Sequence, residues 1–269
     1  MAQYVPHYKD WQTVEKWRSA ASVAFYAGVI LSLLIAAKEY DIFNQLKISY
    51  PTLMRFVDKT ISVLTVVTLI AYPVLDTYIE FWVAPSAEEK RKADFLDNTF
   101  GTHLLVANSV GYYTNDTLSP GLYKAAVNQF ENAFFTHRVT EAMTTRKLIP
   151  LVLVLLVVIV MAVFGWGEQP LAIPMLQLLF SSAIAIDFIK YWLLRNRTKN
   201  IYEGWCSLFR TSTINQNPTS QTPEILRYWL MYETTLSRLQ IGLDSKTFDK
   251  LNPSLSSEWQ VIKSNLGIR

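Results

Sequence analysis

Two sets of polar and aromatic side chains in this chain are of types suited to binding a ligand. One lies between residues 98 and 132, and the other lies on the segment that follows Thr222. Amide side chains donate and accept hydrogen bonds, so they can bind the edge of a nucleobase or ribose, and tyrosine rings can stack on a base. Arginine favours phosphate. The candidate ligand-binding residues are Asn98, Tyr112, Tyr113, Asn128, Glu131, Asn132, Arg227 and Tyr232.

A purely structural role is the alternative for every one of these residues. Asparagine commonly forms turns and caps, and Phe130, Phe134 and Phe135 recur at a spacing typical of a packed helix. Salt bridges within one helix would account for the charges that follow Thr222. Asp94 and Asp97 lie among lysines and arginines, which favours a solvated helix face.

A third polar set lies inside apolar segments. A polar stripe facing lipid is costly, so such residues should face other helices, another subunit or water. The candidate pore-lining residues are Ser62, Thr65, Tyr72, Asp76, Gln177 and Ser181. Alternatively, the hydroxyl groups bond back to their own helix, and Asp76 lies at the membrane interface.

Four apolar segments must position these residues. The most uniform, Leu148–Trp166, has nineteen positions without an ionisable side chain, and a bilayer core needs about 20 apolar residues of helix. Having no polar group on any face, this segment is expected to be a lipid-facing anchor. The predicted spans are 19–37, 61–82, 148–166 and 170–194, which form two hairpins in an all-α membrane protein.

Charge near the spans sets the expected orientation. Lysine and arginine are more frequent on the side that holds both termini, and cytoplasmic flanks carry this excess. We therefore expect a multi-pass protein of the inner (plasma) membrane with cytoplasmic N- and C-termini. The expected parts are a cytoplasmic N-terminal segment 1–18, a first transmembrane hairpin 19–82, a cytoplasmic helical hairpin 83–147, a second transmembrane hairpin 148–194 and a cytoplasmic helical tail 195–269.

Capping and proline signals predict where the cytoplasmic helices begin. Ser86 and Glu89 form a capping box, which predicts a helix start there and an end near Val106. Pro120 predicts a second start, and Thr222 with Pro223 predicts a third. Asn252 and Pro253 predict that the last helical stretch is split into two short pieces.

Composition and missing motifs exclude several functions. The net charge of +3 is too small for a long basic surface that binds DNA or RNA. Cys206 is the only cysteine, so neither an intrachain disulfide nor a paired-cysteine metal site can form. No glycine-rich phosphate loop, paired-histidine zinc motif or nucleophile turn is present. We therefore expect neither an enzyme nor a cofactor.

The layout and two motifs resemble the four-helix membrane effectors that accompany cyclic-oligonucleotide synthases in bacterial antiphage defence. KADFLDNTFGTHLL, with Asp97 and Phe100, is similar to the family's segment after the second span, and NQFENAFF, with Asn132, is similar to its second cytoplasmic arm. The resemblance implies a homo-oligomer in the lipid bilayer that binds a cyclic nucleotide and permeabilises the membrane. A non-conducting scaffold that recruits a partner is the alternative, and a small transporter is a third.

Overall fold

The computed structural model describes residues 4–37, 47–107, 109–164, 182–211 and 214–268, which divide into two compact units. The hairpin unit takes its described residues from segments 13–83 and 147–188, and the bundle unit takes the rest. Within the described ranges every regular element is a helix, and the one β pairing is an isolated bridge between Tyr4 and Val110. The prediction of an all-α chain is confirmed for this part of the protein.

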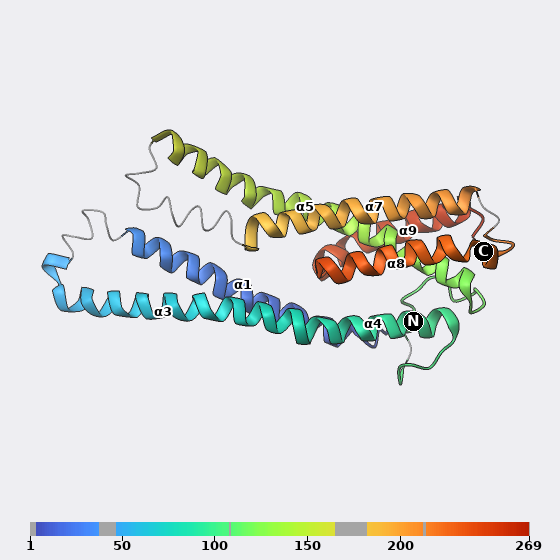
Figure 1. The fold of residues 1–269 in the computed structure, drawn as a ribbon, viewed down its shortest axis with the longest axis horizontal. Helices are drawn as coiled ribbons and strands as arrows, with labels where there is room; N and C mark the ends of the chain where they lie inside the picture. Colours follow the sequence, from blue (N-terminus) through green and yellow to red (C-terminus); the bar gives the residue numbers. More distant parts are fainter. Residues whose placement is uncertain (1–3, 38–46, 108, 165–181, 212–213, 269) are drawn as a thin grey trace. The chain divides into compact units, whose positions relative to one another are not determined.

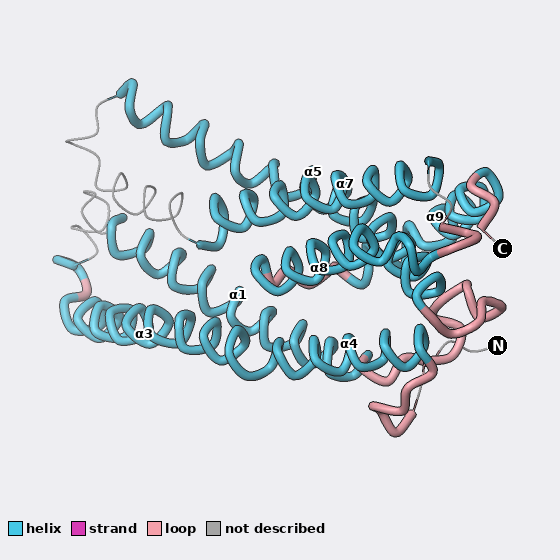
Figure 2. Tube along the Cα trace, turned by 45° about the vertical axis from the view of Figure 1, so that its right-hand side comes forward, coloured by secondary structure: helices cyan, strands magenta, loops and turns pink. Residues whose placement is uncertain are grey.

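In the hairpin unit, α1 (Tyr8–Ala37) and α3 (Pro51–Tyr78) run side by side (Figures 1 and 2). Their contact is close: a Cβ on Gly28 would lie 3.1 Å from the Thr68 hydroxyl, and the Phe25 and Tyr72 rings lie 5.2 Å apart. No residue of α3 is fully buried, and its outer face exposes large apolar side chains such as Leu69. Such a face suits hydrocarbon rather than water.

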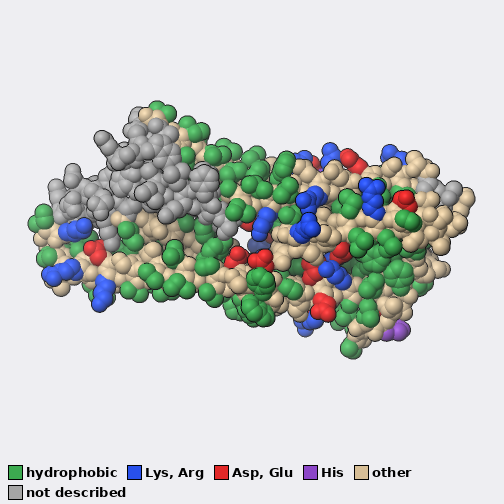
Figure 3. Space-filling view, in the orientation of Figure 1, with side chains coloured by type: hydrophobic (Ala, Val, Ile, Leu, Met, Phe, Trp, Pro, Cys, Tyr) green, Lys and Arg blue, Asp and Glu red, His purple; other side chains and the backbone are tan. Residues whose placement is uncertain are grey.

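Among the described residues, three helices are long and apolar enough to cross a membrane: Tyr8–Ile35, Pro51–Phe100 and Leu122–Val160. They overlap the first three predicted spans, which is consistent with a membrane protein. Of the fourth predicted span, residues 170–181 lie outside the described residues. Figure 3 shows hydrophobic side chains along α3, whereas charged side chains of both signs gather over the bundle unit.

The chain is helical without a break from Pro51 to Phe100. The π-helical turn η1 (Ile79–Val83) joins α3 directly to α4 (Ala84–Phe100). The predicted start at Ser86 is therefore wrong, because the preceding turns already satisfy the amides that a cap would serve. α4 ends before Gly101, whose φ of +68° is left-handed, and not near Val106.

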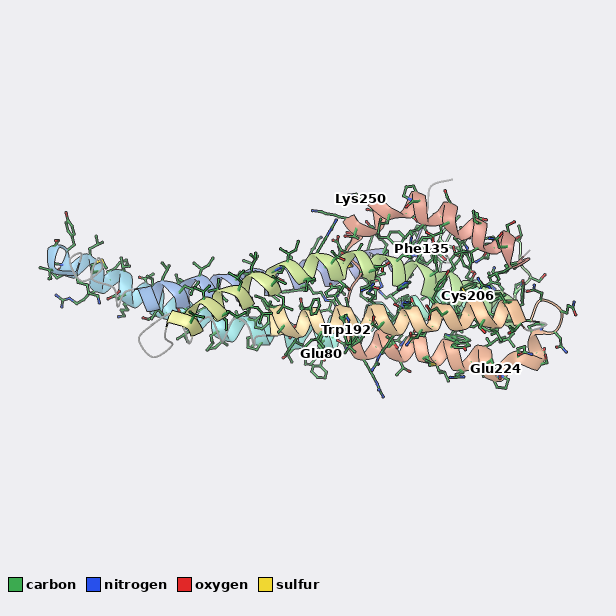
Figure 4. The ribbon with its side chains drawn as sticks, turned by 90° about the horizontal axis from the view of Figure 1, so that it is seen from above. Glu80, Phe135, Trp192, Cys206, Glu224 and Lys250 are labelled. Atoms are coloured by element: carbon green, nitrogen blue, oxygen red, sulfur yellow. The ribbon has the colours of Figure 1, made fainter. Side chains whose placement is uncertain are left out.

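Four helices form the core of the bundle unit: α5 (Leu122–Phe164), α7 (Asp187–Thr211), α8 (Thr222–Leu239) and α9 (Ser245–Asn265). The π turn η2 (Ser182–Ile186) precedes α7, and the 3₁₀ turn η3 (Pro218–Gln221) precedes α8. Phe130, Trp205 and Trp259 are fully buried at the centre of this core. Figure 4 shows Phe135 on α5, where its ring meets Phe248 of α9 at 6.1 Å.

The start predicted at Thr222 and Pro223 is confirmed, and the predicted split of the last helix is wrong. α9 runs unbroken through Pro253. This proline is exposed, whereas Leu255 and Trp259 on the following turns are buried. Burial of these two side chains, about 1.5–3 kcal/mol for each large apolar group, offsets the backbone hydrogen bond that the proline removes.

Candidate functional site

A buried chain of hydrogen bonds links α4, α5 and the loop between them. The Asn128 amide, on α5, donates to Asn98 Oδ1 on α4 at 2.8 Å and accepts from the Asn115 amide at 2.8 Å. Asn115 also donates to Glu131 Oε2 at 2.6 Å. Asn115 and Asn128 are fully buried, so these bonds form in a medium where leaving them unmade would be costly. We call these four residues the amide network.

The last helix closes one end of the amide network. Lys263 of α9 donates to Asn115 Oδ1 at 2.8 Å, and the Trp259 indole donates to the Thr114 hydroxyl at 3.2 Å. Thr114 in turn donates to Glu131 Oε1 at 3.0 Å. The loop from 101 to 121 is thus held between α5 and α9 by polar contacts at its far end.

Glu131 is the titratable group of this network. Burial raises its pKa, while hydrogen bonds from Thr114 and Asn115 and the charge of Lys263 oppose the shift, and the pKa reaches about 7. Glu131 therefore changes charge near neutral pH. Loss or gain of one proton decides whether its carboxyl group accepts only, or also donates.

Aromatic rings adjoin the amide network on the α4 side. Tyr112 and Tyr113 meet edge to face with centroids 4.8 Å apart, and Tyr113 packs on Phe95 of α4. Asn132 hydrogen bonds with the Tyr113 hydroxyl. Tyr113 is buried and Tyr112 is half-buried, so neither ring offers an open stacking face while the loop is in this position.

A charged seam continues along α4 toward α8. Arg91 Nη2 lies 2.5 Å from Glu233 Oε2 and 3.4 Å from Glu88, and Gln129 of α5 donates to Glu233 at 3.2 Å. Burial alone would lower the pKa of Arg91, but the Glu233 carboxylate more than offsets this and raises it. Glu88 and Lys92 both contact Ser237 of α8. Residues 88, 91, 92, 95 and 98 share one face of α4, so this face is held largely by polar contacts.

The opposite face of α4 fixes the loop and the N-terminal segment. Asp97 accepts hydrogen bonds from the Thr102 hydroxyl and from the amides of Leu104 and Leu105, at 2.7–2.8 Å. Burial raises the pKa of Asp97, but these bonds outweigh it and lower the pKa overall. The expectation that Asp94 and Asp97 form a solvated face is wrong: both are buried, because they bond amides of the chain that folds back after Gly101.

His7 and Asp10 bring the start of α1 to the same face. His7 Nδ1 lies 3.6 Å from Asp94 Oδ2, and Lys90 lies 2.6 Å from Asp10. Burial, with a smaller contribution from Arg91, lowers the pKa of His7 to about 4. His7 is therefore neutral at physiological pH, and its contact with Asp94 is not an ion pair.

The structure brings six of the eight candidate ligand-binding residues together. Asn98, Asn128 and Glu131 belong to the amide network, and Tyr112, Tyr113 and Asn132 adjoin it. Tyr232 lies deeper, with its hydroxyl 2.8 Å from that of Thr136, and Arg227 lies apart on the exposed side of α8. Sequence reasoning missed Lys263 and Glu233 because helices distant in the sequence deliver them, and it missed Arg91 because the partner of Arg91, Glu233, lies on one of those helices. Asn115 carried a signal, being an amide in a turn-rich stretch.

The candidate pore-lining residues that are described lie within about 80° of one another around α3, but they differ in exposure. Thr65, half-buried, and Ser62, exposed, donate to the carbonyls of Ile61 and Asp58, both at 2.8 Å, as expected from the alternative in which these hydroxyl groups bond to their own helix. Tyr72 faces α1, and Asp76 is exposed. Gln177 and Ser181 lie outside the described residues.

Comparison with protein-family models, curated proteins and solved structures finds no match for this chain.

Proposed function

We propose that this chain is a membrane effector that senses a nucleotide second messenger through its bundle unit and permeabilises the inner membrane in antiphage defence. One observation carries the proposal: the amide network joins α4 to α5, and both helices continue without a break into helices apolar enough to span a membrane. A ligand that rearranges this network acts directly on helices that enter the bilayer.

The chemistry of the amide network suits a nucleotide. Its side-chain amides hydrogen bond with one another. The edge of a nucleobase also presents donors and acceptors, so it can form hydrogen bonds in place of those between the amides. Entry requires the loop 101–121 to move, which would also uncover Tyr112 and Tyr113 for stacking. A ligand that binds the opened loop more tightly than the closed loop shifts the population by that difference in affinity.

The seam between α4 and α8 is suited to release. The large apolar core is built by α5, α7, α8 and α9, whereas α4 adds only a small cluster around Phe95. A largely buried ion pair such as Arg91–Glu233, whose side chains are 14% and 15% exposed, adds little net stability but fixes one arrangement. Release of α4 from the core would therefore cost less than unpacking any of the four core helices.

A scaffold that does not conduct is the second candidate, and the packing of α1 on α3 favours it. The contacts of Gly28 with Thr68 and of Phe25 with Tyr72 occupy the face that a pore would need. Small residues and hydroxyls serve helix association equally well. A pore lined by α3 therefore requires α1 to move away from Thr68 when the assembly opens.

Efflux from liposomes separates the two candidates. Purified protein in vesicles loaded with a fluorescent dye should release the dye only when a member of a panel of cyclic di- and trinucleotides is added. Asn128→Ala should abolish release, whereas Asp249→Asn, at an exposed position of α9, should leave it unchanged. Binding of a cyclic nucleotide without efflux at any dose would favour the scaffold, and absence of binding across the panel would contradict the proposed ligand class.

A further inference from the structure

The outer face of α8 is exposed and carries both apolar groups and charge. Leu230 is 63% exposed and Met231 is 40% exposed, and Arg227 and Glu224 on the same side are exposed as well. The other sides of α8 are occupied, because Tyr232 faces the core and Glu233 faces α4. We call Glu224, Arg227, Leu230 and Met231 the α8 strip.

A shallow groove of about 450 Å³ lies on α7, lined by Tyr202, Glu203, Cys206, Ser207, Arg210 and Thr211. It is not on the side that meets α8. Gly204 faces α8, since a Cβ there would lie 2.3 Å from the Tyr228 ring, and Cys206 follows about 200° further round the helix. Figure 4 shows Glu224 on the side of α8 away from α7, whereas Cys206 lies on the other side of α7.

The α8 strip and the α7 groove have opposite charges at matching levels. The contact of Gly204 with Tyr228 sets the register of these antiparallel helices, so Arg227 lies level with residue 205 and Glu224 level with residue 208. Glu203 and Arg210 are each two residues from those levels, or about 3 Å along the axis. Glu224 of the strip therefore lies close to the level of Arg210 in the groove, and Arg227 lies close to the level of Glu203. Leu230 is level with Tyr202.

We propose that the α8 strip of one copy of this chain docks in the α7 groove of the next copy. Each contact joins two different surfaces, Glu224 meeting Arg210 and Arg227 meeting Glu203 of the neighbour. Contacts of this kind close into rings when the copies are related by rotation without rise, as copies in one bilayer are. Exposed ion pairs contribute little energy, so the charges select register while Leu230, Met231 and Tyr202 supply the apolar contact.

Disulfide crosslinking in native membranes tests this contact. Arg227→Cys places a thiol level with the native Cys206 of the neighbour, and mild oxidation should give a ladder that extends beyond the dimer. Arg227→Cys combined with Cys206→Ser should give no crosslink, because the contact requires both surfaces. Arg238→Cys, about 16.5 Å further along α8 than Arg227, is the matched control and should also give none.

Charge exchange provides the second test. Glu224→Arg alone should reduce native oligomers at least severalfold in gentle detergent, and adding Arg210→Glu should restore them. A crosslink that stops at the dimer, a crosslink that survives Cys206→Ser, or failure of the exchange to restore assembly would overturn the proposed contact. These readouts need neither ligand nor efflux, so their failure is distinct from failure of the proposed function.

Discussion

At the scale of single residues, Asp97 and Glu131 define the state of the loop between α4 and α5. Asp97 is charged and accepts three hydrogen bonds from the start of the loop, whereas Glu131 titrates near neutral pH at its end. The two carboxyl groups therefore respond to different conditions.

Removal of the Asp97 carboxylate should release the first part of the loop. Asp97→Ala leaves the amides of Leu104 and Leu105 without their carboxylate acceptor, a loss of about 1.5–3 kcal/mol for a hydrogen bond to a charged group. Hydrogen exchange at these amides should accelerate by about 10- to 100-fold. Asp116→Asn, an exposed position in the same loop, should not change it, and equal exchange in both variants would show that Asp97 does not hold the loop.

Glu131 should make stability depend on pH. Its folded pKa of about 7 lies above the ordinary value of 4.5, so the folded protein binds the proton more tightly than the unfolded chain. Protonation of Glu131 therefore adds up to about 3 kcal/mol to the free energy of unfolding. This stabilisation is fully present below pH 4.5 and is lost as pH rises to 7. In unfolding measured across this range, Glu131→Gln should flatten the decline. If the free energy of unfolding of Glu131→Gln declined with pH as steeply as that of the wild type, the decline would belong to another titratable group.

Residue types in the sequence predicted three members of the amide network but not the lysine that binds it from α9. Asn98, Asn128 and Glu131 were predicted from amides and a carboxyl group concentrated in one stretch. Lys263 lies 148 residues from Asn115, and no local pattern predicts that such a lysine will reach a turn. Asp94 and Asp97 were misassigned because charge patterns do not show that a chain will fold back over them.

At the scale of elements, α4 is set apart from the other helices of the bundle unit by its charged seam. A buried pair is costly to break from one side, because the remaining charge has no partner. Arg91→Met should therefore destabilise the fold by about 3–5 kcal/mol, and Glu233→Leu should have a similar effect. The double variant should be less destabilised than either single variant in denaturant unfolding. Additive losses would show that the two side chains act independently.

The register of α7 and α8 depends on Gly204. An added methyl group would meet the Tyr228 ring at 2.3 Å, so Gly204→Ala should cost about 1–3 kcal/mol through overpacking. Tyr228→Ala in the same chain should recover part of the loss measured by thermal unfolding. A fully stable Gly204→Ala variant would contradict the close packing that sets this register.

The observed helix boundaries show that apolar runs predicted the helices better than capping and proline signals did. Apolar runs predicted helices at three places where the described residues do form a helix long and apolar enough to cross a membrane, because a bilayer core needs a uniform apolar run of that length. The capping box at Ser86 failed, since a helix that already exists does not need a cap. Pro253 failed as a breaker because the buried residues around it hold α9 together.

At the scale of the whole molecule, two of the helices that run into apolar segments also carry residues of the amide network. α3, η1 and α4 form one continuous helix, and α5 is another. η1 lies between Pro73 and Pro85, and π turns and prolines are places where helices bend. Movement of α4 can therefore pass to α3 as a bend or rotation at Ile79–Val83.

Tethering α4 to α8 tests this coupling most directly. Glu88→Cys and Ser237→Cys, whose native side chains touch at 3.2 Å, can be joined by a short bismaleimide in a Cys206→Ser background. In dye-loaded liposomes with the cyclic nucleotide panel, the tethered protein should bind ligand but release no dye. Chains carrying either cysteine alone, treated in the same way, should release it. Equal efflux from tethered and untethered protein would contradict the account.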